Sequence, residues 1–194
     1  MNRQRTKGGS TMKNVLVVSG HPRLDDDSVA NKAVVEELGK LDGFTVDRLD
    51  ALYPDYTFDV AAEQEKLVSA DVIVLQYPVF WYAMPALLQK WMEDVFVHGF
   101  SHGSKGKALV GKKLVVSMTI GAPEEAYGQD AAVHVEDLLI PVKGACALTG
   151  MEFAGYEYTC GVSYASRVDD AAREAIAQAG REQAARVATL VQGL

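Results

Sequence analysis

The chain has 194 residues, of which 48% are hydrophobic and 23% are charged. These proportions are typical of one globular domain and exclude a disordered or collagen-like chain. The chain has 26 acidic and 19 basic residues, and three of the basic residues lie among the first eleven. The remainder therefore has 16 basic and 26 acidic residues. This negative net charge disfavours binding to nucleic acid or anionic membranes. The only two cysteines, Cys146 and Cys160, are not spaced like the ligands of a metal site. They indicate neither a disulfide framework nor a metal site. Two such cysteines favour a cytoplasmic protein in which both thiols are inert and packed.

Residues 1–11 (MNRQRTKGGST) are basic and small. They lack the apolar segment of a secretory signal, so we expect a disordered extension followed by a single domain over residues 12–194. No apolar stretch approaches the ~18 residues that span a bilayer.

From Met12 onward, apolar runs of strand length alternate with segments of helical period, which is typical of a parallel sheet flanked by helices. Strands are predicted over 14–19, 44–49, 71–76, 113–119 and 151–158, and helices over 28–41, 61–69, 85–97, 136–148 and 169–191. The first, third and fourth strands are nearly all Val, Leu and Ile, as in central strands, whereas the second alternates like an edge strand. The predicted fold class is α/β, with a doubly wound five-stranded parallel sheet in three layers.

Ligands of such folds bind at the loops that leave the carboxyl ends of the strands, here 20–27, 77–84 and 120–129. In the first loop, His21 and Arg23 precede a helix start at Ser28, Val29, Ala30 and Asn31. The free N–H groups of a helix start can bind a phosphate. Alternatively, Ser28 only caps its helix and His21 packs in the turn. Neither a GxGxxG fingerprint nor a P-loop is present.

The second loop places Phe80, Trp81 and Tyr82 directly beyond a buried strand. Exposed aromatic surface of this kind needs a cover, which could be a flat ring, a subunit partner or the next helix of the same chain. The third loop has small residues at 119–122, so that its backbone amides can approach a ligand closely. Tyr127 and His134 follow, and either could stabilise a reduced, anionic ring or lie on the surface.

Motifs at these loops carry a family resemblance. They read SGHP at 19–22, SVAN at 28–31, LYPD at 52–55, AAEQ at 61–64 and QYPVFWYAMPALL at 76–88. Over residues 12–192 the sequence resembles the flavodoxin-like NAD(P)H dehydrogenase (quinone) family, and within it the ancillary oxidoreductase subunits of glutathione-regulated potassium-efflux systems.

The resemblance implies a strand order of 2-1-3-4-5, a tightly bound FMN, a homodimer and ping-pong hydride transfer from NAD(P)H to a quinone. Tyr127 is the catalytic residue that it implies. The expected cofactor-binding residues are His21, Arg23, Ser28, Val29, Ala30, Asn31, Pro78, Val79, Phe80, Trp81, Tyr82, Thr119, Ile120, Gly121 and Ala122. Ile120 and Ala122 stand where relatives often carry glycine, and His134 has no certain counterpart.

Alternatives remain open at this stage. The chain could be a regulatory flavin-binding subunit docked on a membrane potassium-efflux transporter, and so peripheral to the inner membrane. It could also be a nitro- or azo-reductase, or a one-electron carrier. Residues 95–123 contain lysines and histidines but no acid. They could contact the phosphates of NAD(P)H or an acidic neighbour, or they could form a solvated loop.

Overall fold

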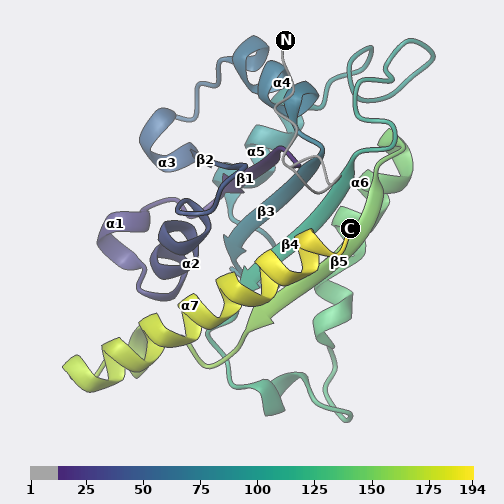
Figure 1. Cartoon of the computed structure of the whole chain (residues 1–194). Coiled ribbons are helices and arrows are strands. Elements are labelled where there is room, and N and C mark those ends of the chain that lie inside the picture. Colours follow the sequence, from purple (N-terminus) through teal and green to yellow (C-terminus); the bar gives the residue numbers. More distant parts are fainter. Residues whose placement is uncertain (1–12) are drawn as a thin grey trace.

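The structure is a computed structural model that describes residues 13–194, and the extension predicted over residues 1–11 lies outside the described residues. Five parallel strands form one sheet in the order β2–β1–β3–β4–β5 (Figure 1), which confirms the predicted class and strand order. The strands are β1 (Val15–Ser19), β2 (Phe44–Arg48), β3 (Val72–Pro78), β4 (Lys113–Thr119) and β5 (Glu152–Thr159). As predicted, β2 is an edge strand, and β1, β3 and β4 are central and buried on both faces.

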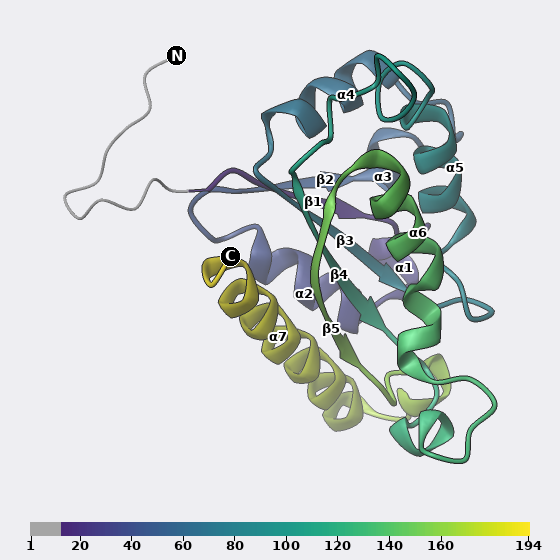
Figure 2. The same ribbon diagram turned by 90° about the vertical axis from the view of Figure 1, so that its right-hand side faces the viewer.

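Helices cover both faces of the sheet, which makes three layers (Figure 2). Because successive side chains of a strand point to opposite faces, Val15 and Val17 of β1 pack against α2 (Ala30–Leu38) and α7 (Asp170–Gln192). Leu16 and Val18 pack on the other face. That face is covered by α4 (Val60–Ser69), α5 (Ala86–Val95) and α6 (Ile140–Thr149), with the short helix α3 (Leu49–Leu52) at its edge.

The helices predicted to end at residues 41 and 97 end at Leu38 and Val95, and two predicted helix starts are wrong for local reasons. The helix predicted over 28–41 begins at Ala30, because Ser28 has an extended backbone. The helix predicted over 136–148 is divided into a 3₁₀ turn, η2 (Val135–Leu139), and α6. Pro141 lies in the first turn of α6, where its missing N–H and its ring prevent the α-helix from extending backwards. The sequence analysis did not predict α1 (Leu24–Asp27), α3, η1 (Glu124–Tyr127) or η3 (Tyr164–Ser166).

A buried ionic cluster holds α4 against β2 and α5. The Lys66 ammonium donates to Asp47 Oδ1 at 2.7 Å and to Glu63 Oε1 at 2.5 Å. The Tyr53 hydroxyl and the Trp91 indole N–H each donate to Glu63 at 2.8 Å. Burial, followed by the nearby Glu63, raises the pKa of Asp47 to about 7. Two buried carboxyl groups therefore share one ammonium, and the fold favours a proton on Asp47.

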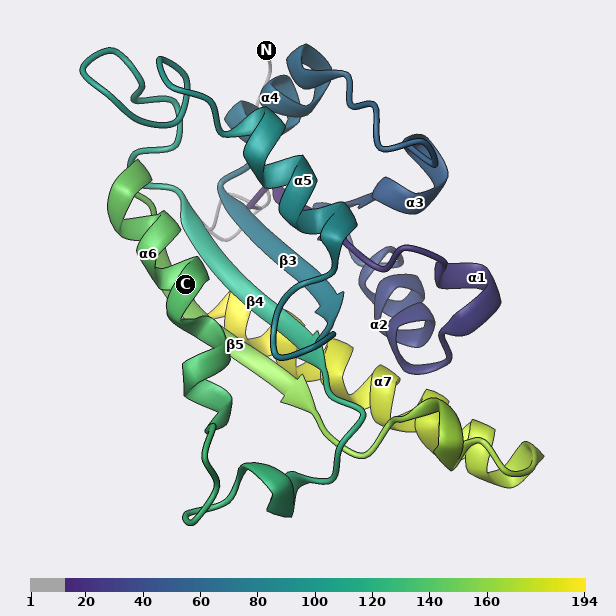
Figure 3. The same cartoon turned by 180° about the vertical axis from the view of Figure 1, so that it is seen from behind.

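The basic stretch lies far from the loops at which ligands were expected. The loop between α5 and β4 that carries Lys105 and Lys107 is at the amino edge of the sheet, opposite the carboxyl ends of the strands (Figure 3). Lys112 donates to the carbonyl of Ala70 at 2.6 Å, and Lys113 to that of Leu194 at 2.7 Å. The stretch therefore lies away from the candidate loops of its own chain, and its contact with the phosphates of NAD(P)H stays a prediction. None of the helices in residues 13–194 has the length and apolarity needed to cross a membrane.

Candidate functional site

The loop after β1 starts with a close approach between backbone and helix. A Cβ atom on Gly20 would lie 2.6 Å from Leu88 Cβ of α5, so only glycine fits here without displacing the helix. The Gly20 N–H donates to the carbonyl of Gln76 at 2.8 Å, which keeps the loop aligned with β3. The chain then forms α1, whose Leu24 N–H donates to Asp50 Oδ2 at 2.9 Å. These contacts place the start of α2 at the carboxyl edge of the sheet.

His21 lies buried beneath this loop. Its Nδ1 accepts a hydrogen bond from the Arg23 N–H at 3.1 Å, which assigns the ring proton to Nε2. Its ring meets Phe80 edge-on, with centroids 6.1 Å apart. Burial lowers the pKa of His21 to about 4, although Asp50 and Asp27 act to raise it. At neutral pH His21 is therefore an uncharged hydrogen-bond donor.

At the start of α2, some polar groups are hydrogen-bonded within the chain and two backbone N–H groups are not. Ser28 and Asn31 are buried, and Ser28 Oγ accepts from both the N–H and the Nδ2 of Asn31, at 3.1 and 3.0 Å. Ser28 thus caps its own helix. The N–H groups of Val29 and Ala30 donate to no other residue of the described chain, so that they remain able to bind an anion. Arg23 is exposed and pairs with Asp27 one helical turn later.

A buried chain of polar side chains supports the loops from below. Asn31 Oδ1 accepts from Gln76 Nε2 at 2.7 Å and from the Thr119 hydroxyl at 3.0 Å. Gln76 Oε1 accepts from the Ser117 hydroxyl at 2.6 Å, and Gln183 Nε2 of α7 donates to Ser117 Oγ at 2.9 Å. Such networks fix a single arrangement of the elements that they join. The sequence analysis did not assign Gln76, Ser117 or Gln183 to the site. Gln76 and Ser117 could have been noticed, because they are polar residues within otherwise apolar strands.

The aromatic loop after β3 is a tight, strained turn. Phe80 and Ala83 exchange two backbone hydrogen bonds, at 2.9 and 3.0 Å. Between them Trp81 and Tyr82 have positive φ angles of 51° and 62°, as in the two-residue type I′ turn that Asn-Gly favours. Positive φ costs an L-residue about 1–2 kcal/mol, yet the Trp81 side chain is 95% exposed and gains no burial in return. Strain joined to exposed aromatic surface indicates a place where a ligand or partner packs.

Pro78 and Val79 connect this turn to the sheet. Pro78 is the buried last residue of β3, and the Val79 N–H donates to the carbonyl of Thr119 at 2.8 Å. Therefore the turn is held firmly beside the loop that follows β4.

The loop after β4 presents few free groups. Thr119 is the buried last residue of β4, and the buried Ile120 that follows it donates its N–H to the carbonyl of Thr159 at 2.8 Å. The N–H groups of Gly121 and Ala122 have no acceptor among residues 13–194. Of the four residues expected to bind a ligand here, these two offer amides to it.

Tyr127 of η1 faces the aromatic turn. Its ring meets that of Tyr82 edge-on, with centroids 6.4 Å apart. Burial, followed by the neighbouring Tyr82, raises the pKa of Tyr127, so its phenol keeps its proton at neutral pH and can donate a hydrogen bond. His134 instead precedes η2 as its N-terminal cap, where its N–H donates to Asp137 Oδ2 at 2.8 Å.

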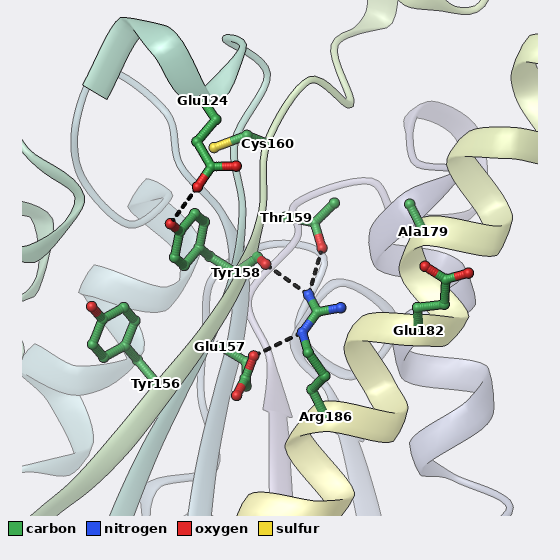
Figure 4. Close-up of a pocket in the computed structure, with 9 residues that line it drawn as sticks. All are labelled: Glu124, Tyr156, Glu157, Tyr158, Thr159, Cys160, Ala179, Glu182 and Arg186. Atoms are coloured by element: carbon green, nitrogen blue, oxygen red, sulfur yellow. Dashed lines mark hydrogen bonds and ion pairs between the residues drawn. The ribbon is translucent and has the colours of Figure 1, made fainter. Parts of the chain in front are cut away.

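A groove of about 810 Å³ runs between the outer edge of β5 and α7 (Figure 4). Its polar groups bond mainly to one another: the Tyr158 hydroxyl donates to Glu124 at 2.9 Å, and Arg186 donates to Glu157 and to the carbonyl of Tyr158, each at 2.8 Å. Burial raises the pKa of the Cys160 thiol in this groove to about 11, which leaves it a poor nucleophile. The loops at the carboxyl ends of β1, β3 and β4 remain the stronger candidate site.

The chain is similar in sequence to two kinds of known protein. The chain is 40% identical over 157 residues to general stress protein 14 of Bacillus subtilis (strain 168), covering 80% of this chain and 89% of the relative. It is 37% identical over 139 residues to the glutathione-regulated potassium-efflux system ancillary protein KefF of Enterobacter sp. (strain 638), covering 72% and 78%.

Two solved structures have the same architecture. General stress protein 14 from Treponema denticola, in complex with FMN, matches with a TM-score of 0.80 and 30% identity over 91% of this chain and 99% of that chain. An NADPH-quinone reductase from P. pentosaceus matches with a TM-score of 0.71 and 25% identity, over 88% and 97%.

The family model described as the flavodoxin-like fold matches residues 13–183. This range includes all five strands and each of the three loops described above. The match agrees with the strand order of the sheet and with the resemblance carried by the loop motifs. The chain therefore belongs to the flavodoxin-like fold family.

Proposed function

We propose that this chain is an oxidoreductase that binds FMN at the carboxyl edge of its sheet and transfers hydride from NAD(P)H to a quinone by a ping-pong mechanism. The observation that carries the proposal is the strained turn at Trp81 and Tyr82, which presents exposed aromatic rings between two loops with free backbone amides. The FMN bound by general stress protein 14 of T. denticola and the activity named for the P. pentosaceus protein support it.

The residues present fit such a cofactor. The free N–H groups of Val29 and Ala30, with Nε2 of His21, suit its phosphate. The aromatic turn suits its flat ring system. The free amides of Gly121 and Ala122 suit the polar edge of that ring, which would then lie between the turn and Tyr127.

Bound FMN would supply the hydride chemistry, which amino-acid side chains cannot perform. The protein contributes placement and electrostatics. Tyr127 keeps its proton and would donate it as a hydrogen bond toward negative charge at the polar edge of the ring, together with the amides of Gly121 and Ala122. Trp81 and Tyr82 would hold the nicotinamide and the quinone in turn against the ring and exclude water.

A homodimer is part of the proposal. Large apolar side chains are exposed on loops and helix starts at the carboxyl edge, with exposed fractions of 95% for Trp81, 62% for Ile140, 76% for Tyr164 and 80% for Val168. A second subunit over this edge would bury them and cover the site. Sedimentation velocity tests this, and a monomer at all micromolar concentrations would contradict it.

The test of function uses the purified full chain, reconstituted with FMN. We expect a yellow protein whose visible flavin absorption bleaches when NADPH is added without oxygen and returns when a quinone such as menadione follows. Parallel double-reciprocal plots would support the ping-pong order, and intersecting plots would contradict it. A chain that takes up no flavin would refute the proposal. Faster turnover with a nitroaromatic or an azo dye than with any quinone would assign a different acceptor.

The relationship to the potassium-efflux ancillary protein favours a second candidate, a regulatory subunit of a membrane transporter. Co-purification of the tagged chain with such a transporter from its own cells tests it. Loss of that complex in a variant with normal quinone turnover would separate the two roles.

A further inference from the structure

The proposed phosphate site lacks an evident positive charge on its own loop. His21 is neutral, because burial lowers its pKa to about 4. Arg23, expected from the sequence to assist, is exposed and forms an ion pair with Asp27. A phosphate monoester carries nearly two negative charges at neutral pH, and the start of α2 offers only about half a charge of the opposite sign. If FMN binds here as proposed, a further group must supply the positive charge that balances its phosphate.

Arg167 reaches this loop from a distant part of the chain. It lies between β5 and α7, and its Nη1 donates to the carbonyl of Asp27 at 2.5 Å, one residue before the helix cap Ser28. Its guanidinium carbon lies 5.0 Å from the centroid of the Tyr164 ring, over the ring face. Its Nε is buried and has no hydrogen-bond partner among residues 13–194.

The packing of α7 against α2 places Arg167 there. The two helices lie side by side (Figure 1), and a Cβ atom on Gly180 of α7 would lie 2.5 Å from the carbonyl oxygen of Ala30. Gly180 therefore allows α7 to approach the first turn of α2 closely. As a consequence, the segment that precedes α7 lies against the loop that precedes α2.

We propose that Arg167 binds the phosphate of FMN and makes the site selective for FMN over riboflavin. The buried Nε leaves Arg167 with an unused hydrogen-bond donor, which is costly, so a phosphate at the start of α2 that draws the guanidinium toward it would give this group the acceptor that the described chain does not provide. The guanidinium fork matches phosphate oxygens, and the bond to Asp27 together with the Tyr164 ring holds it before the ligand binds. Arg167 stays charged because an arginine is not deprotonated in proteins.

The experiment titrates FMN and riboflavin into the flavin-free protein and follows the quenching of flavin fluorescence. Arg167→Gln should raise the Kd for FMN by about 10- to 100-fold, the usual loss for charge-assisted hydrogen bonds, and leave the Kd for riboflavin unchanged. Arg167→Lys, which keeps the charge without the fork, should give an intermediate Kd for FMN. Arg173→Gln is the matched control, because Arg173 is an exposed neighbour whose charge acts on Arg167; its FMN affinity should remain near that of the wild type.

The outcomes separate this inference from the function on which it rests. If Arg167→Gln weakens both flavins equally, or neither, Arg167 has at most a structural role and the inference is wrong. If Arg173→Gln matches Arg167→Gln, general electrostatic attraction and not a specific contact binds the phosphate. If the wild-type chain binds neither flavin, the proposed function itself fails.

Discussion

Trp81 offers a direct measurement of strain stored at the site, through the two substitutions Trp81→Gly and Trp81→Ala. Its φ is 51°, which costs any L-residue about 1–2 kcal/mol and costs glycine almost nothing. Glycine gives back about 0.5–1 kcal/mol through its greater freedom in the unfolded chain. Because the Trp81 side chain is 95% exposed, removal of the ring itself changes the free energy of unfolding little.

We therefore expect flavin-free Trp81→Gly to be more stable than flavin-free Trp81→Ala by roughly 1 kcal/mol, which corresponds to a Tm difference of about 2–4 °C for a chain of this size. Trp81→Ala, which keeps the Cβ and the strain, should match the wild type. Calorimetry of the flavin-free proteins measures both differences. Both variants lack the ring, so both should bind FMN more weakly by a similar factor, about 3- to 10-fold if ring contact contributes about 0.5–1.5 kcal/mol.

The alanine variant is the control, because it removes the ring but keeps the Cβ atom and the positive φ. A Trp81→Gly variant that is no more stable than Trp81→Ala would refute the prediction, because the strain in the turn would then not exceed the entropic cost of glycine. A Trp81→Ala variant clearly less stable than the wild type would show that the ring packs where the structure leaves it exposed.

Three further predictions follow from the contacts described above. Tyr127→Phe should retain FMN but slow its reduction by NADPH about tenfold, because one hydrogen bond to developing charge is lost; unchanged stopped-flow rates would remove Tyr127 from the mechanism. Gln76→Leu should lower the free energy of unfolding by about 2–4 kcal/mol, because it breaks two buried hydrogen bonds and leaves the Ser117 hydroxyl without its acceptor; a loss below about 1 kcal/mol in urea denaturation would show that the network adds little. Asp47 has a pKa of about 7 in the fold against an ordinary value of 3.8, so the folded chain retains a proton that the unfolded chain loses, and the stability from this group falls as the pH rises from about 4 to 7. Asp47→Asn should consequently gain about 2–3 kcal/mol relative to the wild type between pH 5 and pH 8, and a difference that does not vary with pH would contradict the assignment.

The sequence by itself determined the layers of this protein. Runs of Val, Leu and Ile in β1, β3 and β4 predicted central strands, and the alternation in β2 predicted an edge. These elements follow from the local pattern of side chains, because only a strand covered on both faces can bury such a run. The loop motifs then indicated which edge of the sheet carries the site. Helix ends were less certain where a single residue decided them, as Pro141 did at the start of α6.

Contacts between distant segments decided the rest. Asn31, expected to face a phosphate, turns its side chain inward to Gln76, 45 residues away. Arg167 meets the loop after β1 across 140 residues, and no local pattern marks it. Burial, which exists only in the folded chain, makes His21 a neutral hydrogen-bond donor. The physical reason is the same in each case: propensity and periodicity act over a few residues, whereas hydrogen-bond partners and desolvation are set by which segments the completed sheet brings together.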